Sequence, residues 1–350
     1  MKVLITRFMV FCLICTNLFA SKPNRVGTTA ANFLEIGYGS AGNAMGDASV
    51  ASVADLSAMY WNPARLAYLQ QNEALFMYQP WFADISTAFT GIGLVDQTLG
   101  TFAVGFIHVG YGDMEVTTME MQDGTGEMFA ANDYAINLVY ARHLVNWFSF
   151  GAGVKYISSQ IWHCKASALA MDLGVVVNTQ FLSATGKRED GITIGMSIAN
   201  YGTKMKYDGM DLLQPIDAFP EEEGNYKYVE GQYRTQGWEL PLIFRIGAAY
   251  HPVVTASHKL TLEIDALHPN NNSESLNAGA EYQYNMATFG SFFLRGGYKA
   301  LFMEDSEYGL SLGAGVLSRM MNNFALRIDY AFRDIGILGK THSYTVSFLF

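Results

Sequence analysis

The chain carries little charge for its length. Asp, Glu, Lys and Arg make up 15% of its 350 residues and hydrophobic residues 50%, where about 25% charged residues is typical. Disorder requires high charge with low hydrophobicity, so this composition excludes it. Lys and Arg are the scarcer charged class, at 22 against 32 Asp and Glu. Nucleic acid, a polyanion, is therefore not expected as a partner.

Cysteine is rare as well. Of the three cysteines, Cys12 and Cys15 lie in an N-terminal apolar run and only Cys164 lies beyond it. One remaining cysteine excludes an internal disulfide framework. Leu13 and Ile14 are too bulky for the site before a lipidated Cys15, so a lipid anchor is not expected.

Long hydrophobic runs are missing too. The run from Val3 to Leu18 follows Lys2 and closes on Ala20, which predicts a signal peptide over residues 1–20. A membrane-spanning helix needs roughly 20 apolar residues, and no later segment reaches that length without a charge or a glycine. If the mature chain crosses a membrane, it must do so by other means.

Glycine, with 34 residues, and aromatic residues, at 14%, are abundant. From residue 73 onward the sequence divides into short runs bounded by Gly, Pro, Asn or Asp, a pattern typical of strands and turns. About fourteen strands are predicted, over residues 73–80, 86–96, 100–112, 133–144, 148–162, 168–179, 192–202, 241–252, 258–269, 274–285, 291–301, 308–319, 323–334 and 342–350.

Alternation gives these strands two unlike faces. In the run 342–350, Tyr344, Val346, Phe348 and Phe350 share one face. Many strands carry charged residues opposite such an apolar face, and a Lys or Arg facing lipid near mid-membrane costs about 2–4 kcal/mol. If the apolar faces meet lipid, the charges must face the lumen: Arg245, Glu263, Asp265, Glu281, Arg295, Lys299, Arg327 and Asp329.

The same alternation suits a soluble β-sandwich with its apolar faces inward. Connection lengths favour a barrel, because the two longest, residues 112–132 and 202–240, both follow odd-numbered strands, whereas most connections after even strands are short. Outer-membrane barrels show this asymmetry between outer loops and periplasmic turns. The connection 181–191 is the exception. We therefore predict an all-β fold: a transmembrane antiparallel barrel over residues 73–350 in the bacterial outer membrane.

Residues 21–72 lack the alternating pattern and are predicted to form a plug, or hatch, inside the barrel. A helix-like stretch is expected around 49–59, and Asn62-Pro63-Ala64 reads as a turn that starts a short helix. The residues of this motif are Gly42, Gly46, Asp47, Tyr60, Trp61, Asn62, Pro63 and Ala64.

The run from Gly42 to Ala51, followed by Tyr60-Trp61-Asn62-Pro63-Ala64, resembles the start of PorV/PorQ family proteins, part of the wider FadL-like group of barrels. Arg65 departs from the glycine common in that family. The resemblance implies a barrel of fourteen strands with an N-terminal hatch. It also implies a role in type IX secretion, binding exported cargo proteins and delivering them to the surface machinery. The FadL-like alternative is transport of a fatty acid or another hydrophobic solute.

Two other motifs lack their structural context. Gly37–Gly42 matches a dinucleotide fingerprint but no βαβ unit follows, and Gly309–Gly313 matches a hydrolase elbow but lies within a predicted strand. His108 or His251 beside a serine would be needed for a catalytic dyad. No zinc-binding spacing occurs among the histidines. We expect no enzymatic activity, no cofactor and no metal site.

The connection 202–240 is acidic and rich in aromatic residues. As a partner-binding loop it would use rigid aromatic side chains as contacts; as a plain outer loop it would only be solvated. Both interpretations stay open. The candidate contact residues are Tyr226, Tyr228, Tyr233 and Trp238. Expected partners are outer-membrane lipid, exported cargo and secretion components, or a hydrophobic small molecule.

Overall fold

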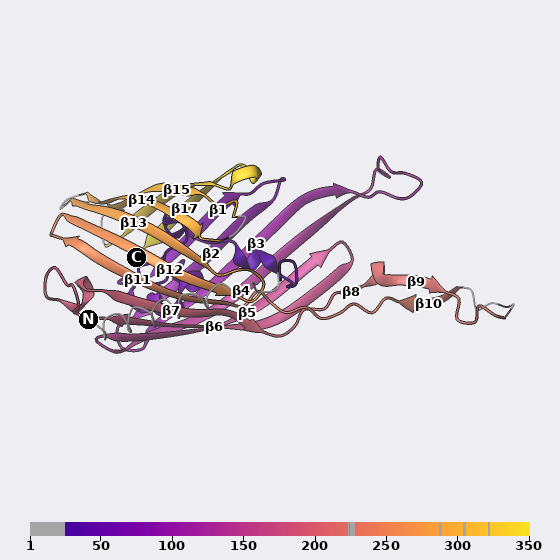
Figure 1. The fold of residues 1–350 in the computed structure, drawn as a ribbon, viewed down its shortest axis with the longest axis horizontal. Coiled ribbons are helices and arrows are strands. Elements are labelled where there is room, and N and C mark those ends of the chain that lie inside the picture. The colour runs from indigo at the N-terminus through magenta and orange to yellow at the C-terminus, as the bar shows by residue number, and fades with distance from the viewer. Residues whose placement is uncertain (1–24, 223, 225–227, 287–288, 304–305, 321–322) are drawn as a thin grey trace, which may run out of the picture.

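In a computed structural model, residues 25–350 are described, apart from 223, 225–227, 287–288, 304–305 and 321–322. Within this part of the chain, one antiparallel sheet of fifteen strands closes on itself (Figure 1). One of the fifteen, β8, is a two-residue addition to β6, which leaves a barrel of fourteen strands. The predicted fold class is confirmed. The predicted signal peptide, residues 1–20, lies outside the described residues.

The first seven barrel strands are β1 (Glu73–Pro80), β2 (Ser86–Asp96), β3 (Gly100–Glu115), β4 (Met128–Val145), β5 (Phe148–Ile161), β6 (Cys164–Asn178) and β7 (Thr193–Gly202). The other seven are β11 (Ile243–Val254), β12 (His258–Pro269), β13 (Ser275–Met286), β14 (Gly290–Leu301), β15 (Leu310–Arg319), β16 (Ala325–Asp334) and β17 (Lys340–Leu349). β1 closes the ring by pairing with β17, from Glu73 opposite Leu349 to Tyr78 opposite Tyr344.

Every predicted strand lies on an observed one, but several differ in extent: β6 begins at Cys164, four residues earlier than predicted, and β3 and β4 are also longer. β3 runs on to Glu115 and β4 begins at Met128, so the connection predicted over 112–132 shrinks to 116–127. The sequence predicts that the third strand ends at Gly112. Instead Gly112 lies in a β-bulge between Gly110 and Asp113, with φ of +73°, and pairing resumes beyond it.

The outer wall is apolar and the inner face polar. Along β16, Leu326, Ile328, Tyr330 and Phe332 alternate with Arg327, Asp329 and Arg333, and only the charged set is fully buried. A row of large apolar side chains exposed around the ring is what a lipid-facing surface requires. None of the helices among the described residues is long and apolar enough to cross a membrane.

The two ends of the barrel differ. Connections at one end, here called the short-turn end, are mostly tight, such as residues 97–99 and 146–147, whereas the other end, the arm end, carries the long segment 203–242. The exception predicted at 181–191 is a short-turn-end connection that holds the 3-10 helix η4 (Arg188–Asp190).

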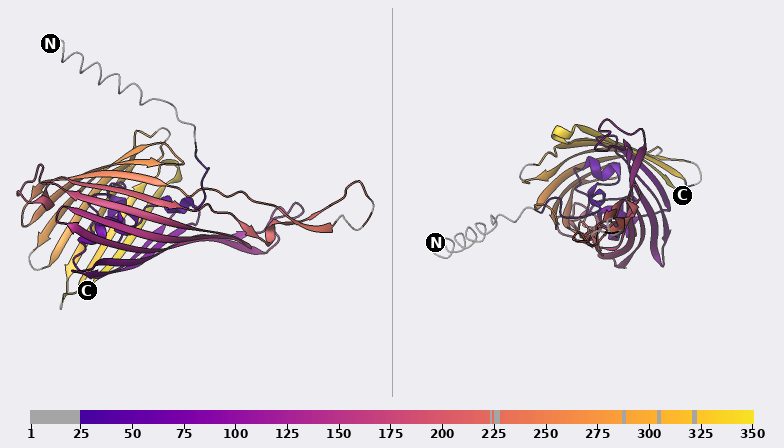
Figure 2. Two further views of the ribbon diagram at one scale, coloured as in Figure 1. Left: turned by 90° about the horizontal axis from the view of Figure 1, so that it is seen from below. Right: turned by 90° about the vertical axis from the view of Figure 1, so that its right-hand side faces the viewer.

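The described N-terminal segment, residues 25–72, is the hatch. It lies inside the barrel, as the end-on view of Figure 2 shows for the indigo ribbon. Its elements are short: η2 (Asn32–Glu35), α2 (Ser40–Ala44), α3 (Ala58–Trp61) and η3 (Pro63–Tyr68). The helix-like stretch predicted over 49–59 is wrong in extent, because only its last two residues are helical. A helix of four residues leaves most of its backbone groups to outside partners, and the barrel wall supplies some of them: Thr345 Oγ1 accepts from Ser40 N, and Ser197 Oγ donates to the Trp61 carbonyl.

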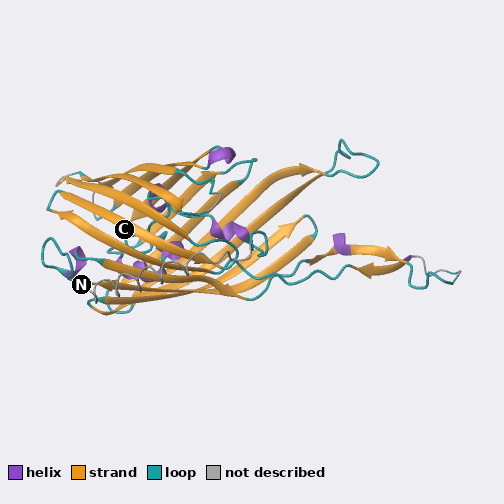
Figure 3. Ribbon diagram, viewed as in Figure 1, coloured by secondary structure: helices purple, strands orange, loops and turns teal. Residues whose placement is uncertain are grey.

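The segment 203–242 contains β8 (Asp208–Gly209), η5 (Met210–Leu212), β9 (Leu213–Ile216) and β10 (Val229–Gln232). We call residues 206–237 the arm. β9 and β10 pair only with each other, and the hairpin extends far beyond the rim of the barrel (Figures 1 and 3).

Candidate functional site: the hatch in the lumen and the arm at the rim

The glycines of the hatch motif permit close contacts that a side chain would block. A Cβ on Gly42 would lie 2.6 Å from Trp61 Nε1, and one on Gly46, whose φ is +66°, would lie 2.5 Å from the Tyr298 backbone nitrogen in β14. Trp61 is buried and donates from Nε1 to the Tyr38 carbonyl at 2.8 Å. The motif therefore brings the hatch backbone directly against the wall.

Asn62, Pro63 and Ala64 form the predicted turn. The Asn62 side chain accepts from Ala64 N at 3.1 Å and caps η3, with Pro63 at the first helical position. Its Nδ2 also donates to the carbonyl of Val175 in β6 at 3.1 Å. One asparagine thus starts the 3-10 helix and ties it to the wall.

Asp47 lies at the centre of a buried ion-pair cluster. Its carboxylate contacts Lys299 Nζ of β14 at 2.7 Å and is also paired with Arg333 of β16. Burial by itself raises the pKa of Asp47, but the charges of Arg333 and Lys299 outweigh it and hold the pKa below its usual value of 3.8. The hatch carboxylate is therefore held in its charged form by two wall cations.

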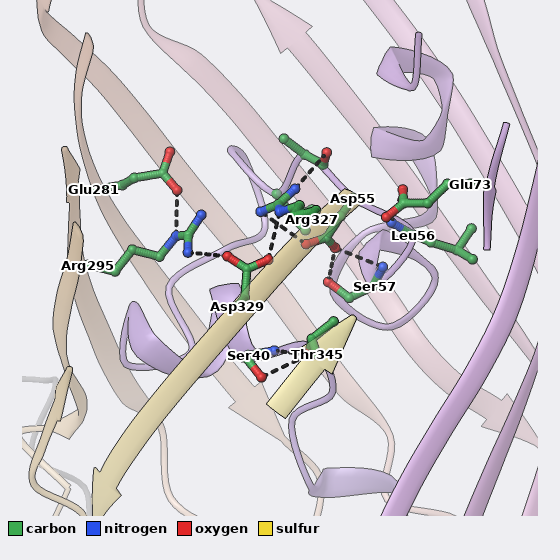
Figure 4. Close-up of polar contacts among 12 residues, drawn as sticks. Ser40, Asp55, Leu56, Ser57, Glu73, Glu281, Arg295, Arg327, Asp329 and Thr345 are labelled. Atoms are coloured by element: carbon green, nitrogen blue, oxygen red, sulfur yellow. Dashed lines mark hydrogen bonds and ion pairs between the residues drawn. The ribbon is translucent and has the colours of Figure 1, made fainter. Parts of the chain in front are cut away.

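A second chain of charges runs from the hatch across the wall (Figure 4). Asp55 lies 3.4 Å from Arg327 Nη2, and Arg327 Nε lies 2.7 Å from Asp329. Arg295 then bridges Asp329, at 2.7 Å from Nη1, and Glu281, at 2.6 Å from Nε. Buried charges are tolerated when each has an opposite partner.

Carboxylates of the wall also bind backbone N–H groups of the hatch. Asp265 accepts from Ser49 N at 2.7 Å and Val50 N at 3.0 Å, and Glu263 accepts from Ala51 N at 2.6 Å. Both acids lie on the inner face of β12. The turn at 49–51 has no helix of its own, so these acids satisfy amides that would otherwise be unpaired inside the barrel.

Arg245, the remaining predicted inward charge, is buried and packs over the ring of Tyr60 at 5.0 Å. This is a cation–π contact between β11 and α3. The structure therefore places all eight predicted wall charges on the inner side and brings seven of them together in polar contacts, with the hatch or with one another.

Lys155 forms a buried ion pair that the sequence does not predict. Lys155 Nζ of β5 lies 3.0 Å from Asp172 of β6 and 2.6 Å from Asn200 Oδ1 of β7. Asn200 has φ of +64° and sits beside a shift in the register between β6 and β7. Alternation puts Lys155 inside, but nothing in the sequence pairs it with residues 17 and 45 positions away.

The histidines considered for a dyad have other neighbours. His251 Nδ1 lies 3.1 Å from the Thr261 hydroxyl, and the His108 ring stacks on Phe106 with their centroids 6.4 Å apart. Neither histidine has a hydrogen bond to a serine among the described residues, so the geometry of a Ser–His dyad is not formed by them.

The arm is closed at its base. Met205 and Trp238 exchange two backbone hydrogen bonds of 2.8 Å, and Ala30 N of the hatch donates to the Glu239 carbonyl at 2.9 Å. Of the four predicted contact residues, Tyr228 is 84% exposed, Tyr233 65% and Trp238 48%. Tyr226 lies outside the described residues. Tyr228 and Tyr233 are thus displayed rather than packed, whereas Trp238 is about half exposed at the base of the arm.

The sequence matches the family described as type IX secretion system protein PorV over residues 19–218, more than half of the chain. The chain belongs to the PorV family. The family match and the barrel together point to the bacterial outer membrane. No match was found among the curated proteins.

Solved barrels show the same fold as this PorV-family chain. The toluene transporter TodX of Pseudomonas putida is 13% identical, with 89% of this chain and 97% of that chain covered and a TM-score of 0.56. The toluene transporter TbuX of Ralstonia pickettii is 11% identical, covering 89% and 97%, with a TM-score of 0.54. A FadL homologue of Pseudomonas aeruginosa is 12% identical, covering 93% and 99%, with a TM-score of 0.51. At these identities the likeness concerns the fold.

Proposed function

We propose that this barrel binds exported cargo proteins through its arm, on the outer side of the bacterial outer membrane, and delivers them to the surface machinery of a type IX secretion system. The observation that carries the proposal is the arm itself: a hairpin with exposed aromatic side chains, standing clear of the barrel. Long loops of outer-membrane barrels face outward and short turns face the periplasm. This rule places the arm on the cell surface.

A two-stranded hairpin gains stability from a partner, because by itself it is marginal in water. β9 and β10 leave their outer edges unpaired among the described residues, so an extended segment of a partner can add to either edge. Tyr228 and Tyr233 supply rigid apolar surface beside those edges. The arm therefore has both backbone and side-chain means of holding a protein.

The hatch supports a role at the rim rather than in the lumen. It is tied to β12 by Glu263 and Asp265, to β14 by Lys299 and to β16 by Arg327 and Arg333. Moving it out of the way would break several buried ion pairs at once. A fixed hatch is expected in a protein whose partners dock on its outside.

Hydrophobic-solute transport is the alternative, and one feature favours it. At the arm end a mostly apolar cavity of about 840 Å³ lies between the hatch and the extended ends of β3–β5, with Phe33, Tyr111, Phe129 and Trp238 in its lining. This volume suits a small-molecule site, and the printed titles of TodX and TbuX name toluene.

The decisive experiment is affinity capture of the detergent-solubilised barrel from its native outer membrane, with mass spectrometry of copurified proteins and lipids. In one variant, residues 213–232 are replaced by Gly-Gly. Leu212 and Tyr233 can be joined this way because Tyr233 N already donates to the Leu212 carbonyl at 2.9 Å. The matched control, Met119→Ser with Met121→Ser, removes exposed apolar groups from the other long loop.

Capture of exported proteins that share a C-terminal domain, lost in the hairpin deletion and kept in the control, would support cargo binding. A bound fatty acid or other apolar molecule with no protein partner would instead support transport.

A further inference from the structure

A second cavity, of about 790 Å³, lies at the short-turn end beneath the hatch. It is bounded by hatch residues such as Arg65 and Tyr68 and by the inner faces of β11–β16, and the connection that carries η4 reaches its edge through Glu189. Its volume falls within the range of small-ligand sites. The hatch closes its inner side, so a ligand must come from the periplasmic side.

Cations outnumber carboxylates in its lining. The cations are Arg65, Lys259, Arg295, Arg319 and Arg327, and the carboxylates are Glu73, Glu189 and Glu281. Arg295 and Arg327 belong to the ion-pair chain described above. Within the part of the chain that the structure describes, the other three cations have no ion-pair partner.

Neutral groups fix the orientation of the Arg65 side chain. Its Nε donates to the Val53 carbonyl at 2.8 Å, its Nη2 to the Ser52 carbonyl at 3.2 Å, and its guanidinium lies 4.3 Å from the centre of the Tyr68 ring. These contacts fix the guanidinium without neutralising it. Burial lowers the pKa of Arg65 and outweighs the attraction of the Glu263 carboxylate, which is not within ion-pair distance.

Lys259 of β12 lies half-buried within electrostatic range of Arg65, which repels it, and of Asp190, Glu281 and Glu189, which attract it. Each of these acids has another partner within ion-pair or hydrogen-bond distance: Glu189 lies 3.6 Å from Lys187, Asp190 accepts from the Thr185 hydroxyl, and Glu281 lies 2.6 Å from Arg295 Nε. Like charges held together in a cavity attract an anion.

A second observation also points to a ligand. Arg295 is 4% exposed and lines the cavity, yet its Nη2 has no hydrogen-bond partner among the described residues. A buried donor without an acceptor is unfavourable, and a bound acceptor would relieve it. The walls also include Leu69, Phe293 and Leu317, so the ligand has an apolar part beside its charge.

We propose that this cavity is a binding site for an organic carboxylate that reaches it from the periplasm, with Arg65, Lys259 and Arg319 as its counter-charges. The ligand is either a free short-chain acid or the C-terminal carboxylate of an extended peptide. The site goes beyond the arm function and is independent of it, because it lies at the opposite end of the barrel.

The test is isothermal titration of the full barrel in detergent micelles with three probes: succinate, N-acetyl tetra-alanine, and the same peptide with its C-terminus amidated. Lys259→Gln and Arg319→Gln are the test variants, since neither side chain has a hydrogen bond among the described residues to lose. Lys340→Gln, at the start of β17 on the arm end, is the matched control for net charge.

We expect at least one carboxylate probe to bind and the amide not to bind. Lys259→Gln and Arg319→Gln should each weaken binding about tenfold, the effect of one charged hydrogen bond, while Lys340→Gln and the hairpin deletion leave it unchanged. Binding of the acid peptide alone assigns the site to a peptide terminus, and equal binding of succinate assigns it to free acids. The proposal would be overturned if neither carboxylate probe binds, or if Lys259→Gln and Arg319→Gln both leave binding unchanged. Either result is independent of whether the arm binds cargo.

Discussion

At the scale of single residues, the molecule depends on polar pairs between the hatch and the wall. Asp47 shows this most clearly, because it meets two cations from two strands and has φ of +64°. Asn tolerates that backbone conformation as well as Asp does, so Asp47→Asn removes the charge and spares the turn. The other buried pairs obey the same rule: removing one partner leaves the other charge unpaired inside the barrel.

Asp47→Asn should lower the free energy of unfolding by about 3 kcal/mol, because Lys299 and Arg333 lose a buried counter-charge. The measurement is urea unfolding in detergent micelles followed by tryptophan fluorescence. Asp123→Asn, an exposed site in the connection between β3 and β4, should leave the midpoint unchanged. Equal midpoints for Asp47→Asn and wild type would contradict the assigned role.

The ion pairs of Asp47 also predict that the stability of the protein depends on pH. Since the folded-state pKa of Asp47 lies below its usual 3.8, its contribution to stability is complete above that value and is lost as the pH falls through the folded-state pKa. The stability difference between wild type and Asp47→Asn should therefore shrink as the pH drops below 3.8. A difference that does not change with pH would argue against the charged pair.

At the scale of elements, glycines in the wall decide how closely the hatch can pack. A Cβ on Gly297 of β14 would lie 2.1 Å from the Met45 carbonyl carbon, whereas one on its neighbour Gly296 would come no closer to another atom than 3.4 Å, at Leu312 Cδ2. Gly297 thus faces the packed hatch, whereas its neighbour in the same strand faces the open outer surface. Small residues let backbones approach each other.

Gly297→Ala should destabilise the seated hatch by about 1–3 kcal/mol through overpacking, and Gly296→Ala should be nearly neutral. Limited proteolysis of the folded barrel, read by mass spectrometry over residues 25–72, measures how often the hatch is released. Similar cleavage of the two variants would show that the hatch does not contact Gly297 closely in solution.

The arm behaves as a separate element. Amides in β9 and β10 should exchange with solvent much faster than those of β14, because the hairpin pairs with no third strand among the described residues. Hydrogen–deuterium exchange with mass spectrometry measures this. Protection of the hairpin as strong as that of β14 would show that the arm is held by contacts absent from this structure.

The elements themselves were largely predictable. β1 and β2 fall on their predicted bounds because alternation and turn residues define both ends. β3 was cut short because Gly112 is as suited to a bulge as to a turn, and only pairing with β4 distinguishes the two. The hatch elements could not be predicted over 49–59, because amides there bind Asp265 and Glu263, more than 200 residues away. Partners so far away in the chain cannot be inferred from the residues next to these amides.

At the scale of the whole molecule, the closed ring and its filled lumen predict a barrel that passes few ions. Wild-type protein in a planar lipid bilayer should show almost no steady conductance, because the hatch occupies the lumen and buried ion pairs hold it to the wall. Gly297→Ala should add brief openings. Large, stable channels in the wild type would mean that the hatch leaves the lumen in a bilayer.

The way the hatch is enclosed also constrains how the molecule is assembled. Residues 25–72 contact strands from both halves of the ring, from β6 to β16, and the ring is completed only when β1 meets β17. A segment with this many buried partners cannot be inserted through the end of a finished cylinder. The hatch must therefore already be in position when the strands assemble around it and the ring closes. Substitutions in the hatch will then lower the yield of folded barrel before they change the activity of each folded barrel.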